Sequence, residues 1–228
     1  MSKLKVKNSS EVIEVQNVYC VGKNYLDHIK EFDASEKSAE VPKEPIIFLK
    51  PNSAVLTDSN IVRIPEFKRA KISDNLQNEV ELVVVIGKEG IDIPESEAMN
   101  YIYGYAVGID FTLRDIQTEL KMKGLPWTLS KGFLTSAPVS EIGKKENIAD
   151  AEKLDIGLKI NGETKQSGNT SQMIFKISYI VHYLSSIFGL KRGDIIFTGT
   201  PAGITKLNSG DKIEAEIEKV GKLKITFG

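Results

Sequence analysis

The sequence predicts a mainly β, α+β fold: a mixed β-roll or barrel with a few short helices. Short runs rich in β-branched and aromatic residues are bounded by Gly, Pro, Asn or Asp, which is typical of strands joined by turns. Two further segments have helical periodicity, but they do not alternate regularly with the strands. This order argues against a doubly wound parallel sheet, in which strands and helices alternate.

The expected strands are spread along most of the chain. In order they are VIEVQNVYCVG (12–22), IIFLK (46–50), VELVVVIG (80–87), GYAVGIDFT (104–112), LDIGLKI (154–160), IIFTGT (195–200) and KIEAEI (212–217). Successive side chains of a strand point to opposite faces, so Glu79 and Glu81 share a face with Val83 and Val85. Both faces of this strand are apolar toward its end.

Two helices are expected among these strands. The first opens at Thr112 like a capping box, with Asp115 three residues on, and Gly124 marks its end. The second is closed by Gly189 and carries apolar residues at helical spacing, namely Ile174, Ile177, Val181, Leu184 and Phe188.

The composition bounds the architecture and the kinds of partner. The 228 residues are expected to form a single catalytic domain, 1–228, in which residues 1–16 are an N-terminal strand or extension. Lys plus Arg number 30 against 31 for Asp plus Glu. No excess of positive charge therefore favours a nucleic acid or an anionic membrane as partner.

The same composition predicts a cytoplasmic protein. The N-terminal sequence has no apolar signal region, and the longest apolar run, residues 82–86, is too short to cross a bilayer. Cys20 is the single cysteine, which excludes an intramolecular disulfide and a cysteine-based zinc site. We expect Cys20 to be a small buried hydrophobic residue.

Three acidic residues form a candidate metal site. Side by side on one strand, Glu79 and Glu81 repel each other and are costly to bury unless a cation neutralises them or one keeps its proton. Asp110 ends the strand-like run GYAVGID and supplies a third carboxylate. Oxygen-only ligands suit a hard cation such as Mg²⁺ or Mn²⁺. The alternative is a strand end that carries two hydrated glutamates into solvent.

Polar residues of the first helix follow Asp110 closely. Arg114 comes four residues after Asp110 and Gln117 three residues after Arg114, so they lie on one face of the first turns. This junction thus offers a metal ligand, a cation and an amide. Alternatively, Arg114 only pairs with Asp110 or Asp115 at the surface.

His28 and Glu31 are a candidate proton-transfer pair. They stand three residues apart in VGKNYLDHIKEF, so on a helical turn the carboxylate can hold the imidazole while it takes a proton from water. The same spacing also occurs on ordinary solvated helices. The polar stretch that follows suits a mobile lid over about residues 25–44. His182, the other histidine, is expected on the flank of the second helix.

Lys131 and the loop from Thr198 to Gly203, which includes Thr200, complete the candidates. The loop follows a strand, and its Gly and Thr residues can offer N–H and hydroxyl groups to a carboxylate. It is not a P-loop, because no Gly-Lys-Ser/Thr follows. Alternatively, the loop is an ordinary turn and Lys131 is a surface charge.

Several segments, in their order along residues 17–228, resemble the fumarylacetoacetate hydrolase family: CVGKNYLDHIKE, PIIFLKPNSAV, EVELVVVIGK, GYAVGIDFTLRDIQ, PWTLSKGFLTSAPVS and GDIIFTGTPAGI. The resemblance implies the mixed β-roll of this family's C-terminal domain type, usually assembled as a homodimer. It also implies three kinds of site residue: ligands of Mg²⁺ or Mn²⁺ (Glu79, Glu81, Asp110), a water-activating pair on a lid (His28, Glu31), and groups that bind oxyanions or the substrate carboxylate (Lys131, Arg114, Gln117, Thr200).

Within the family, the chain is most similar to the compact acylpyruvate hydrolase and oxaloacetate decarboxylase branch. Val21 stands where the large fumarylacetoacetases have a further metal-binding Asp. Leu134 replaces the Asp of the Lys-x-Phe-Asp-Thr run of many compact members, which bears on the positioning of Lys131 and Thr135.

The resemblance implies a hydrolase that cleaves a carbon–carbon bond in acylpyruvate-type 2,4-dioxo acids, with a small 2-oxo acid as its partner. The same pyruvate enolate would allow the decarboxylation of oxaloacetate. One alternative is a 2-hydroxyhepta-2,4-diene-1,7-dioate isomerase or a 5-carboxymethyl-2-oxo-hex-3-ene-1,7-dioate decarboxylase, with a proton shift in place of water activation. Another is a non-catalytic β-roll that binds metal and a dicarboxylate.

Overall fold

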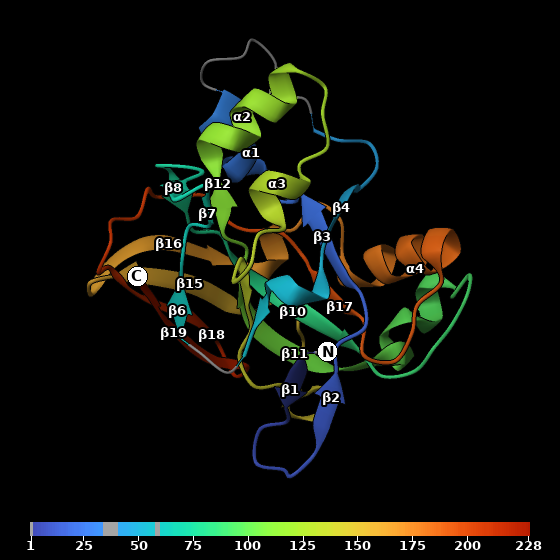
Figure 1. Cartoon of the computed structure of the whole chain (residues 1–228). Coiled ribbons are helices and arrows are strands. Elements are labelled where there is room, and N and C mark those ends of the chain that lie inside the picture. Colours follow the sequence, from blue (N-terminus) through green and yellow to red (C-terminus); the bar gives the residue numbers. More distant parts are fainter. Residues whose placement is uncertain (1, 34–40, 58–59) are drawn as a thin grey trace.

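A six-stranded and a five-stranded sheet form the centre of the molecule (Figure 1), seen in a computed structural model that describes residues 2–33, 41–57 and 60–228. The larger sheet has the order β14-β11-β10-β17-β3-β4, with the bounds Gly143–Lys144, Ile102–Ile109, Val80–Ile86, Ile195–Phe197, Val18–Gly22 and Ile46–Lys50. The smaller sheet has the order β16-β15-β18-β19-β6, with the bounds Glu163–Asn169, Asp155–Ile160, Lys212–Ile217, Gly221–Phe227 and Ile61–Val62.

Short pairs and helices surround the two sheets. The pairs are β1 (Lys3–Lys5) with β2 (Val12–Glu14), β5 (Val55–Leu56) with β13 (Ala137–Pro138), β7 (Glu66–Phe67) with β8 (Ala70–Lys71), and β9 (Leu76–Gln77) with β12 (Thr112–Leu113). The α-helices are α1 (Leu26–Asp33), α2 (Arg114–Met122), α3 (Thr128–Lys131) and α4 (Ile177–Phe188). Four 3₁₀ segments occur within the described residues: η1 (Asn52–Ala54), η2 (Glu95–Tyr101), η3 (Lys145–Asn147) and η4 (Thr170–Gln172).

Strand pairing confirms the mainly β, mixed-sheet prediction. β17 runs parallel to β3 and β6 runs parallel to β19, whereas the other neighbours within the two sheets are antiparallel. Among the described strands neither sheet closes on itself: β14 and β4 remain the edges of one, and β16 and β6 the edges of the other. The architecture is therefore a roll of two open sheets and not a closed barrel.

Strand β10 is buried on both faces, as its sequence predicts. Val80, Leu82, Val84 and Ile86 belong to the main hydrophobic cluster, which also includes residues of the smaller sheet and of α4. The alternate residues of the strand, such as Val83, belong to a second cluster on the other face. Both glutamates of this segment therefore share their side of the strand with apolar core residues.

The strand pattern differs from the prediction in several places. The run 12–22 is not one strand but two, β2 and β3, and between them the backbone N–H and the side-chain amide of Asn17 both donate to Asp194 Oδ1, at 2.9 and 2.8 Å. The run 104–112 is likewise divided between β11 and β12. Strands β16 and β19 were not predicted, and neither were the short strands β5 to β9, β13 and β14. The β16 sequence, ETKQSGN, has no apolar residue, and this strand forms through its pairing with β15.

The first predicted helix begins later than expected. α2 starts at Arg114, whereas Thr112 lies in β12 and donates its hydroxyl to Glu79 Oε1 at 3.1 Å. The capping-box prediction was wrong, because the carboxylate of Asp115 instead accepts hydrogen bonds from Ser73 Oγ at 2.6 Å and from a backbone N–H. Gly124 follows the helix with a φ of +64°, so its predicted place at the C-terminal end is confirmed.

The second predicted helix, α4, is confirmed with smaller differences. It ends before Gly189, which has a φ of +66°. Its buried stripe includes Ile177, Val181 and Leu184, but Phe188 is half exposed. Ile174 precedes the helix and is not part of it.

α1, α2 and α3 lie together at one end of the molecule, away from the β1–β2 pair (Figure 1). α1 falls within the lid predicted for residues 25–44, and residues 34–40 of that prediction lie outside the described part of the chain. Cys20 is fully buried, as expected. Within the described residues, no helix combines the length and the apolar character needed to span a bilayer.

Candidate active site

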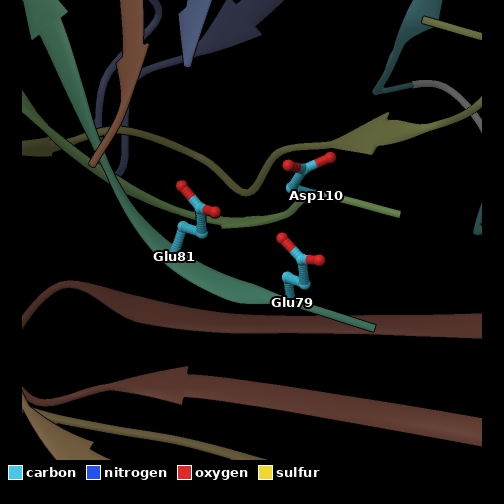
Figure 2. A group of neighbouring side chains, drawn as sticks. All are labelled: Glu79, Glu81 and Asp110. Carbon is cyan, nitrogen blue, oxygen red and sulfur yellow. The ribbon is translucent and has the colours of Figure 1, made fainter. Parts of the chain in front are cut away.

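The three predicted carboxylates meet where β10 begins and β11 ends. Antiparallel pairing sets Val80 opposite Ile109, and the N–H of Asp110 donates to the carbonyl of Glu79 at 2.8 Å. Each of the three residues, Glu79, Glu81 and Asp110, is at most 4% exposed. Each offers one carboxylate oxygen, and these oxygens lie within 4.8 Å of one another (Figure 2). The solvated-strand-end alternative is therefore excluded.

Cations surround Glu79. Its Oε2 accepts a hydrogen bond from Lys131 Nζ at 2.8 Å, and its Oε1 is paired with the guanidinium of Arg114. Burial acts to raise the pKa of the Glu79 carboxyl, but Lys131 and Arg114, with a smaller effect of His28, outweigh burial and hold it below its usual range. Glu79 is thus a carboxylate at neutral pH.

Glu81 has a different environment. Its Oε2 accepts the backbone N–H of Gly199 at 2.7 Å. Burial raises the pKa of the Glu81 carboxyl well above its usual range, and the charges of Asp110 and Glu79 raise it further. The ionised form of Glu81 is therefore disfavoured unless a further cation lies beside it. A hard divalent cation bound by oxygen ligands fits this requirement.

Lys131 lies between two of the carboxylates. Its Nζ is 2.6 Å from Asp110 Oδ2 and 2.8 Å from Glu79 Oε2. Burial acts to lower the pKa of Lys131, but Asp110 and Glu79 outweigh it and raise the pKa above its ordinary value. The ammonium is therefore retained in a buried position, and the surface-charge alternative for Lys131 is excluded.

Lys50 is a second buried cation at the site, and sequence reasoning missed it. Its Nζ is 2.8 Å from Asp110 Oδ1 and donates to Ser136 Oγ at 3.0 Å and to the carbonyl of Lys131. The other residues of β4 are partly or fully exposed, yet Lys50 is buried. The available signal was a lysine at the end of the apolar run IIFLK, directly before Pro51.

Arg114 and Gln117 face the carboxylates from α2. Besides its pairing with Glu79, the Arg114 guanidinium donates through Nε to Gln77 Oε1 at 2.7 Å and through Nη1 to Gln117 Oε1. Arg114 does not take the predicted alternative of a surface pair with Asp110 or Asp115; it binds the Glu79 carboxylate.

The loop after β17 approaches the site closely because it contains Gly199. This residue has a φ of +99°, and a Cβ on it would lie 2.7 Å from the Cβ of Asn24. Thr200 follows and is buried; its hydroxyl accepts a hydrogen bond from Gln166 Nε2 at 2.8 Å. Gln166 also accepts from the N–H of Val80 at 3.0 Å, and so ties this loop to the start of β10. Sequence reasoning did not identify Gln166, which lies in the all-polar strand β16.

α1 brings His28 to the same place. The side chain of His28 is buried, and its Nδ1 lies 3.6 Å from Glu31 Oε2. The two carboxylate oxygens of Glu31 each accept the N–H of Gly203 at 3.2 Å, so this pair is connected to the loop after β17. The predicted helical juxtaposition of imidazole and carboxylate is therefore present.

One cavity joins these groups. Glu31 contacts His28 but is not part of the lining. The lining includes every other predicted site residue, namely His28, Glu79, Glu81, Asp110, Arg114, Gln117, Lys131 and Thr200. Val21 also lines it, so an apolar side chain stands where the large fumarylacetoacetases have an Asp. Leu134 is exposed, and the carbonyl of Lys131 is instead held by Ser136 Oγ at 2.8 Å and by Lys50. Ser136 and Lys50 therefore anchor Lys131 although position 134 is not an Asp.

The fold and the site together define a class of protein: a mixed β-roll with a buried carboxylate triad suited to a divalent cation, surrounded by lysines, an arginine and a histidine. The family model for the fumarylacetoacetate (FAA) hydrolase C-terminal domain matches residues 17–227. The chain belongs to the fumarylacetoacetate hydrolase family.

Individual relatives span several reactions. The chain is 47% identical over 209 residues to the mitochondrial oxaloacetate tautomerase FAHD1 of Mus musculus, covering 92% of this chain and 90% of the relative. The fumarylpyruvate hydrolase of Pseudomonas aeruginosa, solved in complex with Mn²⁺ and pyruvate, is 34% identical with a TM-score of 0.87, covering 99% and 95% of the two chains. The 2-hydroxyhepta-2,4-diene-1,7-dioate isomerase of Mycobacterium marinum is 32% identical with a TM-score of 0.77, covering 94% and 75%.

Proposed function

We propose that the protein is a divalent-metal-dependent hydrolase that cleaves the carbon–carbon bond of an acylpyruvate-type 2,4-dioxo acid. The observation that carries this proposal is that His28 and the buried triad of Glu79, Glu81 and Asp110 line the same cavity. A base for water and a site for a Lewis acid are thus combined in a space lined with further cations.

Glu79, Glu81 and Asp110 would hold the metal, as Mg²⁺ or Mn²⁺. When bound, the metal supplies Lewis acidity toward the oxygens of a 2-oxo acid and stabilises negative charge that develops on them. The solved fumarylpyruvate hydrolase with Mn²⁺ and pyruvate supports this assignment, because it is a relative that carries such an ion together with a 2-oxo acid.

The remaining residues act on water and on the substrate. His28 takes a proton from water, and Glu31 orients the imidazole and stabilises its charged form. Lys131 and Arg114 stabilise the oxyanion that forms when the water adds to the distal carbonyl. Gln117 helps to bind the substrate, and Thr200 donates its hydroxyl to the substrate carboxylate.

A second candidate function is the tautomerisation of oxaloacetate. The 47% identity to the mouse oxaloacetate tautomerase favours it. In this reaction, His28 would move a proton on the substrate instead of taking one from water. The isomerase alternative uses the same proton shift, and the M. marinum isomerase is a relative that supports it. The homodimer and the cytoplasmic location stay predictions.

The His28→Ala variant tests the water-activating role. We expect it to reduce acylpyruvate hydrolysis by roughly 10²–10⁴-fold, the usual contribution of a positioned general base. Oxaloacetate decarboxylation, which needs no attacking water, should decline less. The measurement is a pair of rate constants for the same preparation, together with identification of the acylpyruvate products.

His182→Ala is the matched control. This histidine lies on α4, where its Nδ1 is 2.7 Å from the carbonyl of Ile93, and its loss should leave both rates nearly unchanged. Equal losses on the two substrates in His28→Ala would remove the water-activating role. Conversion of oxaloacetate enol without cleavage of any acylpyruvate would establish tautomerisation as the reaction.

A further inference from the structure

The polar face of α2 continues beyond the residues assigned above. Arg114, Gln117 and Lys121 are spaced by three and four residues, so they lie on one face of the helix. All three line the cavity. With a rise of about 1.5 Å per residue, the backbone of Lys121 is displaced about 10 Å along the helix axis from that of Arg114. Lys121 is exposed whereas the carboxylate triad is buried, so Lys121 occupies the outer part of the cavity.

Aromatic side chains connect the inner and outer cations. Lys131 Nζ lies 5.2 Å from the ring centroid of Phe48. The ring of Phe48 is 5.9 Å from that of Trp127, and Lys121 Nζ lies 5.2 Å from the Trp127 ring. Both aromatic residues line the cavity. The wall between the two ammonium groups is thus aromatic, with its two rings tilted by 56°, and is suited to a carbon chain and not to a second charge.

The outer end of the cavity is strongly cationic. Lys23, at the end of β3, lines it together with Lys121. Desolvation lowers the pKa of Lys121 to about 8, the charges of Arg114, Lys23 and Lys131 contribute to the lowering, and the charge of Glu79 opposes it. Two lysine side chains at this end of the cavity favour an anionic group of a bound ligand there.

We propose that Lys121, assisted by Lys23, binds the distal carboxylate of a dicarboxylic 2-oxo acid whose carbon chain lies against Phe48 and Trp127. The inference rests on the proposed function, which places the 2-oxo acid end at the triad. The displacement of Lys121 along α2 favours a longer chain over oxaloacetate, whose two carboxylates are separated by only two carbon atoms. Lys121 is then the residue that determines the substrate class.

Calorimetric titration of the Mn²⁺-loaded protein with two matched ligands tests this inference. 2-Oxoadipate and 2-oxohexanoate have the same chain length and differ only in the terminal carboxylate. Wild-type protein is expected to bind 2-oxoadipate at least about 10-fold more tightly, the scale of one charge-assisted contact. Lys121→Met should remove this preference, and Lys121→Arg should retain part of it.

Lys123→Met is the matched control, because Lys123 lies just after α2 and is paired with Glu119 on the exposed surface. It should keep the wild-type preference. If wild-type protein binds both ligands equally, or if Lys121→Met keeps the preference, the distal-carboxylate role is overturned while the 2-oxo acid site stands. If neither ligand binds the Mn²⁺-loaded wild type, the proposed function falls together with this inference.

Discussion

The carboxyl pKa is shifted in opposite directions at Glu79, which directly precedes β10, and at Glu81, which lies within it. Glu79 is held as a carboxylate by Lys131 and Arg114. Glu81 has one backbone N–H as its hydrogen-bond donor, and burial and its carboxylate neighbours raise its pKa. The same chemical substitution at the two positions should therefore have opposite effects on the metal-free protein.

We expect Glu81→Gln to stabilise the metal-free protein at neutral and alkaline pH. A carboxyl whose pKa is higher in the folded than in the unfolded state stabilises the fold below its unfolded pKa, and this contribution is lost as the pH rises through the folded pKa. The amide side chain of the Glu81→Gln variant does not ionise, so it loses no stability as the pH rises. Glu79→Gln should instead destabilise, because it leaves Lys131 and Arg114 without their charged partner. Melting temperatures in excess chelator, measured across pH, distinguish the two.

The Glu81→Gln substitution should weaken metal binding although it stabilises the metal-free protein. Glu81→Gln removes one of the negative charges of the triad, so Mn²⁺ affinity measured by calorimetry should decrease by at least about 10-fold, or about 1.4 kcal/mol. Unchanged affinity would exclude Glu81 as a ligand. A melting temperature of Glu81→Gln below that of wild type at alkaline pH would contradict the electrostatic account.

Lys50 is expected to position Asp110. Lys50→Met keeps most of the side-chain length but leaves Asp110 Oδ1 and the carbonyl of Lys131 without their buried cation. Loss of one partner from a buried ion pair costs about 3–5 kcal/mol, so the free energy of unfolding in urea should fall by this amount. The exposed Lys222, paired with Glu216, provides the control variant Lys222→Met. A Lys50→Met protein as stable as wild type would refute this role.

At the scale of elements, the triad depends on close contact between β10, β11 and β17. Gly108 of β11 pairs with Glu81 of β10 in register. A Cβ on Gly108 would lie 2.5 Å from both Phe197 Cε1 and Val83 Cγ2. The strand that carries Glu81 is therefore packed directly on this glycine.

Gly108→Ala should destabilise the protein by about 1–3 kcal/mol, the usual cost of overpacking a core. It should also weaken Mn²⁺ binding, because Glu81 and its strand must shift. Gly221→Ala is the control, since a Cβ there meets only Ser140 Oγ, at 4.0 Å. Denaturant unfolding provides the measurement, and equal stability of the two variants would contradict the packing argument.

Local sequence patterns predicted elements where one physical effect dominates. The two apolar faces of β10 and the helical spacing in α4 follow from burial, and both are present. The start of α2 was misplaced because the Thr112 hydroxyl bonds a residue distant in sequence, Glu79, instead of the helix backbone. β16 has no local apolar signal, and only its pairing with β15 identifies it.

For the whole molecule, the ordered motifs predicted which residues would belong to the site but not how they meet. The cavity unites residues from 21 to 200, and their juxtaposition depends on pairing among strands far apart in sequence. Lys50 and Gln166 were not predicted as site residues, because the contacts that place them there are with residues distant in sequence. Lys50 contacts Asp110 and Ser136, and Gln166 contacts Thr200. No local pattern encodes whether sheets close into a barrel, and the two main sheets of described strands are open.

The central claim is that the buried triad binds a divalent ion on which turnover of a 2-oxo acid depends. The most direct test is the rate of acylpyruvate and oxaloacetate conversion in excess chelator, and again after Mn²⁺ or Mg²⁺ is restored, corrected for the metal-catalysed rate without protein. We expect no enzymatic rate in chelator, recovery with metal in the wild type, and no recovery in Asp110→Asn. Full turnover in excess chelator would contradict the account.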